Sequence, residues 1–215
     1  MYKAIIFDLD GTLLDTSKDI CENLNKTFKN FSLPEISLEK TIELVGNGAR
    51  KLVESAVGER DADFIEKVYL DFSKNYAQSD NNLITLYPGE SEVLQNFKNA
   101  GIKLAILTNK PQRATERVFA KFLANFGFSI VLGQTEYRPL KPNPTSVLEI
   151  LESFQIENND CLFVGDGEAD IQTAKNAGVD CACVLWGFRS RKQLEKAGGK
   201  LFVSSFSELE KIVNF

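Results

Sequence analysis

Short, continuously apolar runs recur along the chain and constrain its fold more than any other feature of the sequence. They occupy residues 4–7, 104–107, 129–132, 161–164, 181–185 and 201–203. Stretches with helical periodicity fill most of the gaps between them, at 91–100, 112–125, 145–154 and 171–177. Runs that are apolar throughout, rather than at alternate positions, are typical of strands buried on both faces. Such strands alternating with helices predict an α/β fold with a parallel, doubly wound sheet.

One long segment, residues 16–87, interrupts this alternation and contains helical patterns without a convincing strand. We expect Ser37 and Asn47 to be the N-caps of two of its helices. The sequence therefore predicts an α/β core formed by residues 1–15 and 88–215, with a helical domain inserted between its first and second strands. Helical insertions at such a place commonly act as lids.

The chain of 215 residues contains no histidine. This excludes Ser-His-Asp triads, Cys-His nucleophiles and zinc sites that need imidazole. General acid–base chemistry must then fall to carboxylates, Lys, Tyr or Cys. Any metal is expected to be a hard ion held by oxygen atoms.

The charge and the cysteine content of the chain indicate which binding partners and which cellular compartment to expect for this protein. Lys and Arg total 25 against 30 Asp and Glu, a net charge of −5, so there is no basic excess for nonspecific nucleic-acid binding. The four cysteines include no C-x-x-C pair and are expected to be reduced thiols. The first apolar run is too short for a signal peptide, and no later run could span a membrane. We expect a cytoplasmic protein, either a monomer or a homodimer, without nucleic-acid or membrane partners.

Polar side chains gather where the predicted strands end. Asp8 and Asp10 follow the first strand, Thr108 and Asn109 the second, Lys141 lies in the loop after the third, and Asp166 and Asp170 follow the fourth. Ligands of open parallel sheets bind beyond the carboxyl ends of the strands. We therefore expect these residues to form one site.

The charges of this set indicate its ligands. Clustered carboxylates repel one another, and a divalent cation with all-oxygen ligands, best fitted by Mg²⁺, relieves that repulsion. Lys141 and a helix N-terminus expected after Thr108 would attract an anion such as phosphate. With both present, one carboxylate could act as a nucleophile that becomes phosphorylated. A second, two residues on, could protonate the leaving alkoxide and then deprotonate water.

The motifs F-D-L-D-G-T-L-L-D-T, T-N-K, K-P-N-P and G-D-G-E-A-D occur in this order along the chain. Together they resemble the four motifs of the haloacid dehalogenase-like phosphatases, and the resemblance covers the whole chain. The helical insert resembles the cap of the phosphoglycolate phosphatase branch, in which a loop like residues 44–50 contacts the substrate. The resemblance implies a Rossmann-like core with an α-helical cap.

The resemblance also implies roles for individual residues. Asp8 would be the nucleophile and a metal ligand, and Asp10 the general acid/base that offers its backbone carbonyl to Mg²⁺. Asp166 would bind the metal, with Asp170 supporting it directly or through water. Thr108 and Asn109 would hold phosphoryl oxygens, and Lys141 would neutralise nucleophile and phosphate. Gly11, Thr12 and Arg50 are the remaining candidate substrate-binding residues.

Several of these residues also have a purely structural interpretation. Gly11 and Thr12 could be simple turn and cap residues, and Arg50 a solvated helix residue. We expect Lys110 to be an exposed lysine at a helix start and Trp186 to be a core aromatic at a strand end. Gly167 stands where relatives often carry Ser, so any hydrogen bond from that hydroxyl is missing.

We therefore predict a Mg²⁺-dependent phosphomonoester hydrolase acting on a small phosphorylated metabolite, with 2-phosphoglycolate the first substrate to try. A pyrophosphatase and a sugar-phosphate mutase are alternatives within the same superfamily. A receiver-like phospho-signalling module is an alternative from another class. Receivers carry their phosphoacceptor after the third strand, however, and the run at 129–132 leads to Gly133 and Gln134, without an Asp.

Overall fold

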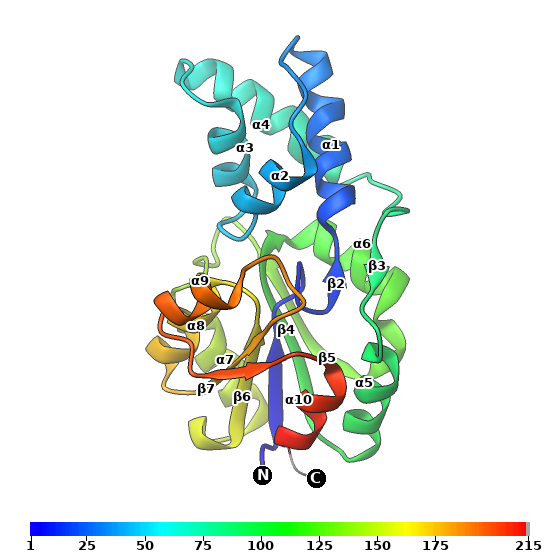
Figure 1. The fold of residues 1–215 in the computed structure, drawn as a ribbon, viewed down its shortest axis with the longest axis vertical. Helices are drawn as coiled ribbons and strands as arrows, with labels where there is room; N and C mark the ends of the chain where they lie inside the picture. Colours follow the sequence, from blue (N-terminus) through cyan, green and yellow to red (C-terminus); the bar gives the residue numbers. More distant parts are fainter. Residues whose placement is uncertain (214–215) are drawn as a thin grey trace.

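The apolar runs of the sequence assemble into one parallel sheet of six strands in a computed structural model that describes residues 1–213 (Figure 1). The strands are β1 (Ala4–Phe7), β4 (Lys103–Pro111), β5 (Phe128–Gln134), β6 (Cys161–Gly165), β7 (Asp180–Val184) and β8 (Leu201–Val203). Their order is β5-β4-β1-β6-β7-β8, and every neighbouring pair is parallel. The doubly wound α/β fold predicted from the alternation is confirmed.

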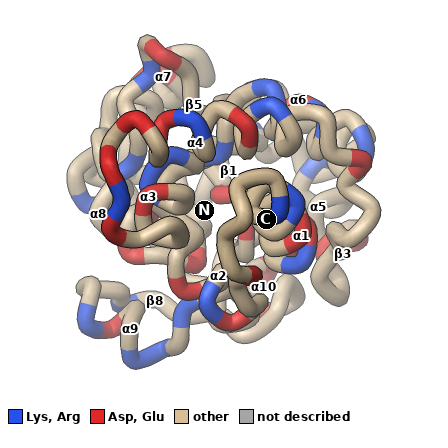
Figure 2. The backbone as a smooth tube through the Cα atoms, turned by 90° about the horizontal axis from the view of Figure 1, so that it is seen from above, with Lys and Arg blue, Asp and Glu red and all other residues tan. Residues whose placement is uncertain are grey.

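Helices cover both faces of this sheet, and successive residues of β1 serve opposite faces. Ile5 and Phe7 pack into one apolar cluster, and Ala4 and Ile6 into the other, as the two-residue repeat of a strand requires. The first face is covered by α5 (Glu90–Asn99), α6 (Gln112–Phe122) and α10 (Phe206–Val213), and the second by α7 (Thr145–Phe154) and α8 (Glu168–Ala177). The short helix α9 (Arg191–Lys196) and the single 3-10 turns η1 (Ala124–Phe126) and η2 (Asn158–Asp160) complete the described core. Seen from above, α7 and α8 lie on one side of β1 and α5 on the other (Figure 2).

The second strand of the sheet is longer than the sequence suggested. β4 continues past Leu107 to Pro111, because beyond a register shift Pro111 still pairs with Gln134 of β5. Helix α6 then begins at Gln112, where the sequence predicts it, so the helix N-terminus expected after Thr108 follows the end of β4. The residues of the T-N-K motif lie on the extended strand before it.

The segment between β1 and α5 forms a helical cap above the carboxyl edge of the sheet (Figure 1). It comprises α1 (Ser17–Asn30), α2 (Leu38–Leu44), α3 (Ala49–Val57) and α4 (Ala62–Tyr76). Its apolar residues form their own cluster, joined by Ala114 of α6. Ser37 caps α2 as expected, accepting a hydrogen bond from the Lys40 amide, but Gly48 rather than Asn47 occupies the N-cap of α3.

The two chain segments that join cap and core lie side by side. Leu14–Asp15 (β2) leaves the core and Thr85–Leu86 (β3) returns to it, and the two pair as antiparallel strands. The expectation that residues 16–87 contain no strand is thus wrong at β3. Two-residue strands are too short to show a periodic pattern, so the sequence gives no warning of them.

None of the described helices is both long and apolar enough to cross a bilayer. Lys and Arg are interspersed with Asp and Glu over the described chain (Figure 2).

Candidate active site

Asp8 directly follows β1 and continues its extended path into the site. Its backbone amide still donates to the Val164 carbonyl of β6, at 2.9 Å, so the sheet itself aims the chain at the carboxyl edge. The backbone then turns sharply at Gly11, which has a φ of +83°. A β-carbon on Gly11 would lie 2.4 Å from Oδ2 of Asp166. Both the positive φ and this close approach therefore require glycine.

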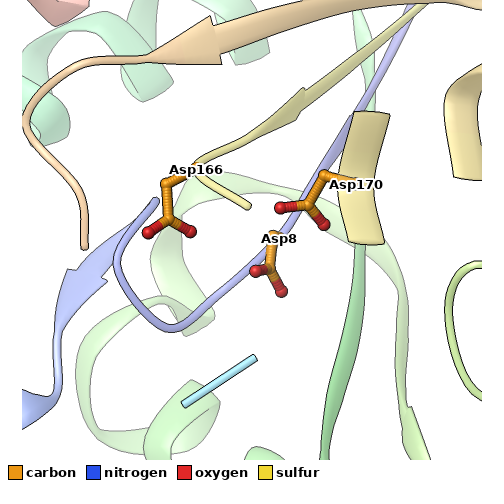
Figure 3. Close-up of side chains that lie close together, drawn as sticks. All are labelled: Asp8, Asp166 and Asp170. Carbon is orange, nitrogen blue, oxygen red and sulfur yellow. The ribbon is translucent and has the colours of Figure 1, made fainter. Parts of the chain in front are cut away.

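Three buried carboxylates converge beside this turn (Figure 3). They belong to Asp8 after β1, Asp166 after β6 and Asp170 in the first turn of α8, and one ligand oxygen from each lies within 4.8 Å of the others. Burial, followed by repulsion from Asp8 and Asp170, raises the pKa of Asp166 to about 8. Burial likewise raises the pKa of Asp8 above its usual range, against the opposing attraction of Lys141. The cluster thus carries more negative charge than its surroundings neutralise.

Lys141 supplies the positive charge nearest to this cluster. Its ammonium lies 2.8 Å from Oδ1 of Asp8 and 2.6 Å from Oδ1 of Asp170. Burial alone would lower the pKa of Lys141, but these two carboxylates raise it, so the side chain stays charged. One ammonium against three carboxylates leaves a buried site that fits an additional cation with oxygen ligands, as the chemistry of the donor set requires.

Asn109 fixes the position of Lys141 and reaches the cap at the same time. Its Oδ1 accepts a hydrogen bond from the Lys141 amide at 2.8 Å, and its Nδ2 donates to the carbonyls of Lys141, at 3.2 Å, and Gly46, at 3.0 Å. Thr108, immediately before it, is buried and also lines the pocket. The second and third motifs of the sequence are therefore brought together with the loop that precedes α3.

The pocket above these residues lies between core and cap. Its floor contains the three carboxylates, Asp10, Thr108, Asn109 and Lys141. From the cap come the side chains of Ile20, Val45, Leu52, Phe72 and Tyr76, together with residues 46–49. The charged chemistry thus lies on the core side, beneath a largely apolar roof.

We compared the chain with known protein families, proteins and structures. The sequence profile of the haloacid dehalogenase-like hydrolases matches residues 5–184.

The chain belongs to this family.

Relatives and solved structures match this hydrolase over nearly its whole length. It is 34% identical to a phosphoglycolate phosphatase of Aquifex aeolicus, over 86% of each chain. It is 32% identical to a phosphoglycolate phosphatase of Vibrio parahaemolyticus, over 98% of this chain and 96% of the relative. A crystal structure from Lactobacillus delbrueckii, of a protein proposed to be a phosphoglycolate phosphatase, matches with a TM-score of 0.93 at 29% identity, covering 99% of this chain and 98% of the other. The family resemblance and the fold predicted from the motifs are confirmed.

Two residues expected to bind substrate instead support the acidic cluster of this hydrolase. The Thr12 hydroxyl is fully buried and donates to Oδ1 of Asp166 at 3.2 Å. Gly11 provides the close approach described above, and neither residue lines the pocket. The other oxygen of Asp166 accepts from the Phe188 amide at 2.7 Å, so this carboxylate is held from two sides.

Asp10 and Lys110 form a separate ion pair at the pocket wall. Lys110 donates to Oδ1 of Asp10 at 2.8 Å and is 4% exposed, so the expectation of a water-exposed lysine was wrong. The extension of β4 is the reason, because it keeps Lys110 on a buried strand. The carboxylate of Asp10 therefore stands apart from the three clustered carboxylates, and the contribution of its backbone carbonyl to a metal stays a prediction.

Arg50 does not reach the pocket of the hydrolase in this structure. Its guanidinium pairs with Glu66 at 2.7 Å and lies over the Tyr69 ring, 4.2 Å from the centroid. It lines a separate cleft between α4 and the start of α6. Residues 46–49, from the loop expected to contact the substrate, line the pocket, whereas the Arg50 side chain points away from it because of the rotation of α3.

Arg189, which the sequence patterns did not single out, reaches the pocket from the core. Its Nη1 donates to the Ile42 carbonyl at 2.9 Å and its Nη2 to the Val45 carbonyl at 2.5 Å, both in the cap. Its Nε contacts Glu168 at 3.3 Å. A core guanidinium thus holds the end of α2, whose last carbonyls lack helical partners. The only signal in the sequence was a basic residue shortly after a strand end.

Proposed function

We propose that this chain is a Mg²⁺-dependent phosphomonoester hydrolase acting on a small phosphorylated metabolite. The observation that carries the proposal is the placement of Asp8 on the pocket floor, with Lys141 at one of its oxygens. Membership of the hydrolase family and relatives named phosphoglycolate phosphatase support it. 2-Phosphoglycolate is accordingly the first substrate to test.

In this proposal the reaction proceeds in two displacements at phosphorus. A carboxylate oxygen of Asp8 attacks the phosphorus atom, the bond to the leaving alkoxide breaks, and Asp10 gives that alkoxide its proton. Water then attacks the phosphorus of the aspartyl phosphate, Asp10 accepts a proton from the water, and phosphate leaves as the Asp8 carboxylate is restored. Asp8 lies beside Lys141 and Asp10 beside Lys110, so the two carboxylates are placed separately. This separation suits their different roles as nucleophile and proton-transfer group.

The remaining residues bind and orient in this scheme. Thr108 and Asn109 line the pocket next to Asp8 and are placed to hold phosphoryl oxygens. Asp8, Asp166 and Asp170 would hold Mg²⁺, which when bound offsets negative charge on the phosphoryl group. Lys141 screens the nucleophile from its acidic neighbours and adds positive charge towards the phosphate.

The cap residues that line the pocket indicate how the leaving group could be recognised. Among the described residues that line the pocket, the cap supplies apolar side chains, Asn47 and Tyr76 but no cation. The lysines that line the pocket are paired with carboxylates, Lys110 with Asp10 and Lys141 with Asp8 and Asp170, which leaves Arg189 of the core as the remaining cation among the described lining residues. A substrate carboxylate would therefore be recognised by Arg189 or by backbone amides of the loop before α3, and not by Arg50.

A phosphate-release assay over a panel of small phosphoesters tests the proposal. The panel should include 2-phosphoglycolate, uncharged alkyl phosphates, sugar phosphates and pyrophosphate, each with Mg²⁺. Repeated release of phosphate from at least one phosphomonoester is the expected result. Preference for pyrophosphate, or isomerisation of a sugar phosphate without release, would favour the two alternatives within the superfamily. Phosphorylation that stops after one turnover, with no hydrolysis, would indicate a receiver-like module.

A further inference from the structure

Lys110 connects a residue of the core site to the last turn of a cap helix. Its ammonium contacts Oδ1 of Asp10 at 2.8 Å and the hydroxyl of Tyr76, the final residue of α4. The same ammonium lies 4.5 Å from the centroid of the Tyr76 ring. The side chain of Lys110 is 1% exposed, so these contacts are shielded from solvent.

Packing alone does not require a lysine at this position. Moving an ammonium out of water costs several kcal/mol unless partners replace its hydration, and a buried ion pair often stabilises a fold no better than apolar side chains of similar size. An apolar residue would serve the interface between β4 and α4 at least as well. The presence of a lysine at this buried position is therefore best explained by its contact with the carboxylate of Asp10.

Tyr76 anchors the cap end of this connection rigidly. Its ring stacks on Phe72, with centroids 5.1 Å apart and planes 22° from parallel, and both rings belong to the buried cluster of the cap. Because Tyr76 is part of that cluster, the packing of the cap sets the position of its hydroxyl. Its hydroxyl contacts the lysine only when α4 sits above β4 as it does here.

Asp10 has one carboxylate oxygen held by Lys110 and one without a hydrogen-bond donor among the described residues. Lys110 occupies Oδ1, and no described group donates a hydrogen bond to Oδ2, although Asp10 lines the pocket. This leaves Oδ2 available to a leaving group or a water, while Lys110 limits rotation of the carboxylate. A proton-transfer group gains rate from being held within hydrogen-bonding distance of its target.

We propose that Lys110 and Tyr76 are a positioning pair, which places the Asp10 carboxylate for proton transfer when the cap is seated on the core. The inference rests on the proposed function, because it assigns a task to Asp10 in phosphoester hydrolysis. It links cap position to chemistry, because displacement of α4 removes the Tyr76 hydroxyl from Lys110 and frees the side chain that holds Asp10. Neither residue touches the reacting atoms in this scheme.

Dependence on the leaving group separates this role from a merely structural contact. An alkoxide must be protonated as it departs, whereas p-nitrophenolate leaves without a proton. The parameter kcat/KM covers the steps up to phosphoryl transfer and is unaffected by later hydrolysis of the aspartyl phosphate. A loosened Asp10 should therefore lower kcat/KM for an alkyl phosphate and spare p-nitrophenyl phosphate.

The test compares Tyr76→Phe and Lys110→Met with the wild type, using p-nitrophenyl phosphate and the best alkyl phosphate of the panel. Tyr76→Phe removes one hydroxyl and keeps the stacked ring, so it stays informative if Lys110→Met fails to fold. We expect kcat/KM for the alkyl ester to fall about tenfold or more in each folded variant, with less than about a threefold change for the aryl ester. Tyr69→Phe, on the same helix but outside the pocket, is the matched control and should change neither.

Equal losses on both esters, or no loss on either, would overturn the positioning role and leave the proposed function intact. A wild-type protein that hydrolyses neither ester would overturn both. Thermal unfolding of each variant, compared with the wild type, confirms that the rates belong to folded protein.

Discussion

The ammonium of Lys141 lies 2.8 Å from Oδ1 of Asp8, and this contact ties the proposed nucleophile to the loop after β5. Because Lys141 also contacts Asp170, it distributes one positive charge between two carboxylates. Asp8 is thereby kept in place at the floor of the pocket, next to Thr108 and Asn109. The positions of the proposed nucleophile, of Lys141 and of the two residues proposed to hold phosphate therefore depend on one another.

Replacing Asp8 by Asn tests the nucleophile. The substitution keeps the size of the side chain but removes its nucleophilic charge, so kcat for the best phosphomonoester should fall by several orders of magnitude. Steady-state phosphate release measures it, and circular dichroism checks that the variant is folded. A variant retaining a tenth of the wild-type kcat would remove Asp8 from this role.

If the acidic cluster binds Mg²⁺ as proposed, metal binding and activity should both depend on pH. Activity should disappear in EDTA and return with Mg²⁺, while Ca²⁺ should restore it poorly because its larger and looser coordination shell misplaces the phosphate. Burial and neighbouring carboxylates raise the pKa of Asp166 to about 8 without metal, so protons compete with the cation below that pH. The Mg²⁺ affinity measured by calorimetry should therefore rise between pH 6 and pH 8, with protons released on binding. Full activity after the metal has been stripped, or an affinity independent of pH, would contradict this prediction.

Arg50 and Arg189 offer a paired test of cap recognition. Arg50 forms an exposed ion pair outside the pocket, and such pairs contribute little, so Arg50→Ala should change kcat/KM for 2-phosphoglycolate less than about twofold. Arg189→Ala removes charged hydrogen bonds to the carbonyls of Ile42 and Val45, and should lower kcat/KM about tenfold or more. This reverses the expectation that the sequence alone supports for Arg50. If kcat/KM fell strongly in Arg50→Ala but stayed at the wild-type value in Arg189→Ala, the cap would have to rearrange to bring Arg50 into the pocket.

Glu90 should make the stability of the core decrease as pH rises. It lies at the start of α5, is fully buried, and neither carboxylate oxygen has a hydrogen-bond partner among the described residues. Burial raises its pKa from 4.5 to about 8, so the folded protein binds this proton more tightly than the unfolded chain does. The contribution is fully present below pH 4.5 and lost as pH rises through about 8, on the order of 5 kcal/mol at about 1.4 kcal/mol per pKa unit.

Urea unfolding of the wild type and Glu90→Gln at several pH values measures this contribution. The variant should show a flatter dependence of unfolding free energy on pH across this window, because Gln does not titrate. Glu92→Gln, on the same helix but exposed, is the matched control and should follow the wild type. Identical pH profiles for the wild type and Glu90→Gln would refute the prediction.

The local sequence pattern was sufficient to predict secondary structure wherever a residue's environment depends on its immediate neighbours in the chain. The strands at Ala4–Phe7 and Leu201–Val203 and the helix at Thr145–Phe154 have the bounds that the sequence predicts. The gathering of Asp8, Asp166 and Asp170 could also be predicted, because parallel strands end at a common edge and each carboxylate lies at or just after such an end. Burial on both faces of the sheet likewise predicts an apolar layer on each side, whereas the order of the strands came from the structure.

What only the tertiary structure decided was the direction of individual side chains at the boundary between cap and core. Lys110 is buried because β4 extends to Pro111 through pairing with β5, a contact between segments distant in sequence. Arg50 faces outward and Arg189 inward because of how α3 is rotated and how the loop after β7 meets α2. A local pattern specifies which residues form a strand or a helix, but the neighbour across an interface depends on packing between segments separated by many residues. The sequence by itself therefore determined the fold class, the acidic centre and the lysine beside it, and the three-dimensional packing determined where Lys110, Arg50 and Arg189 point.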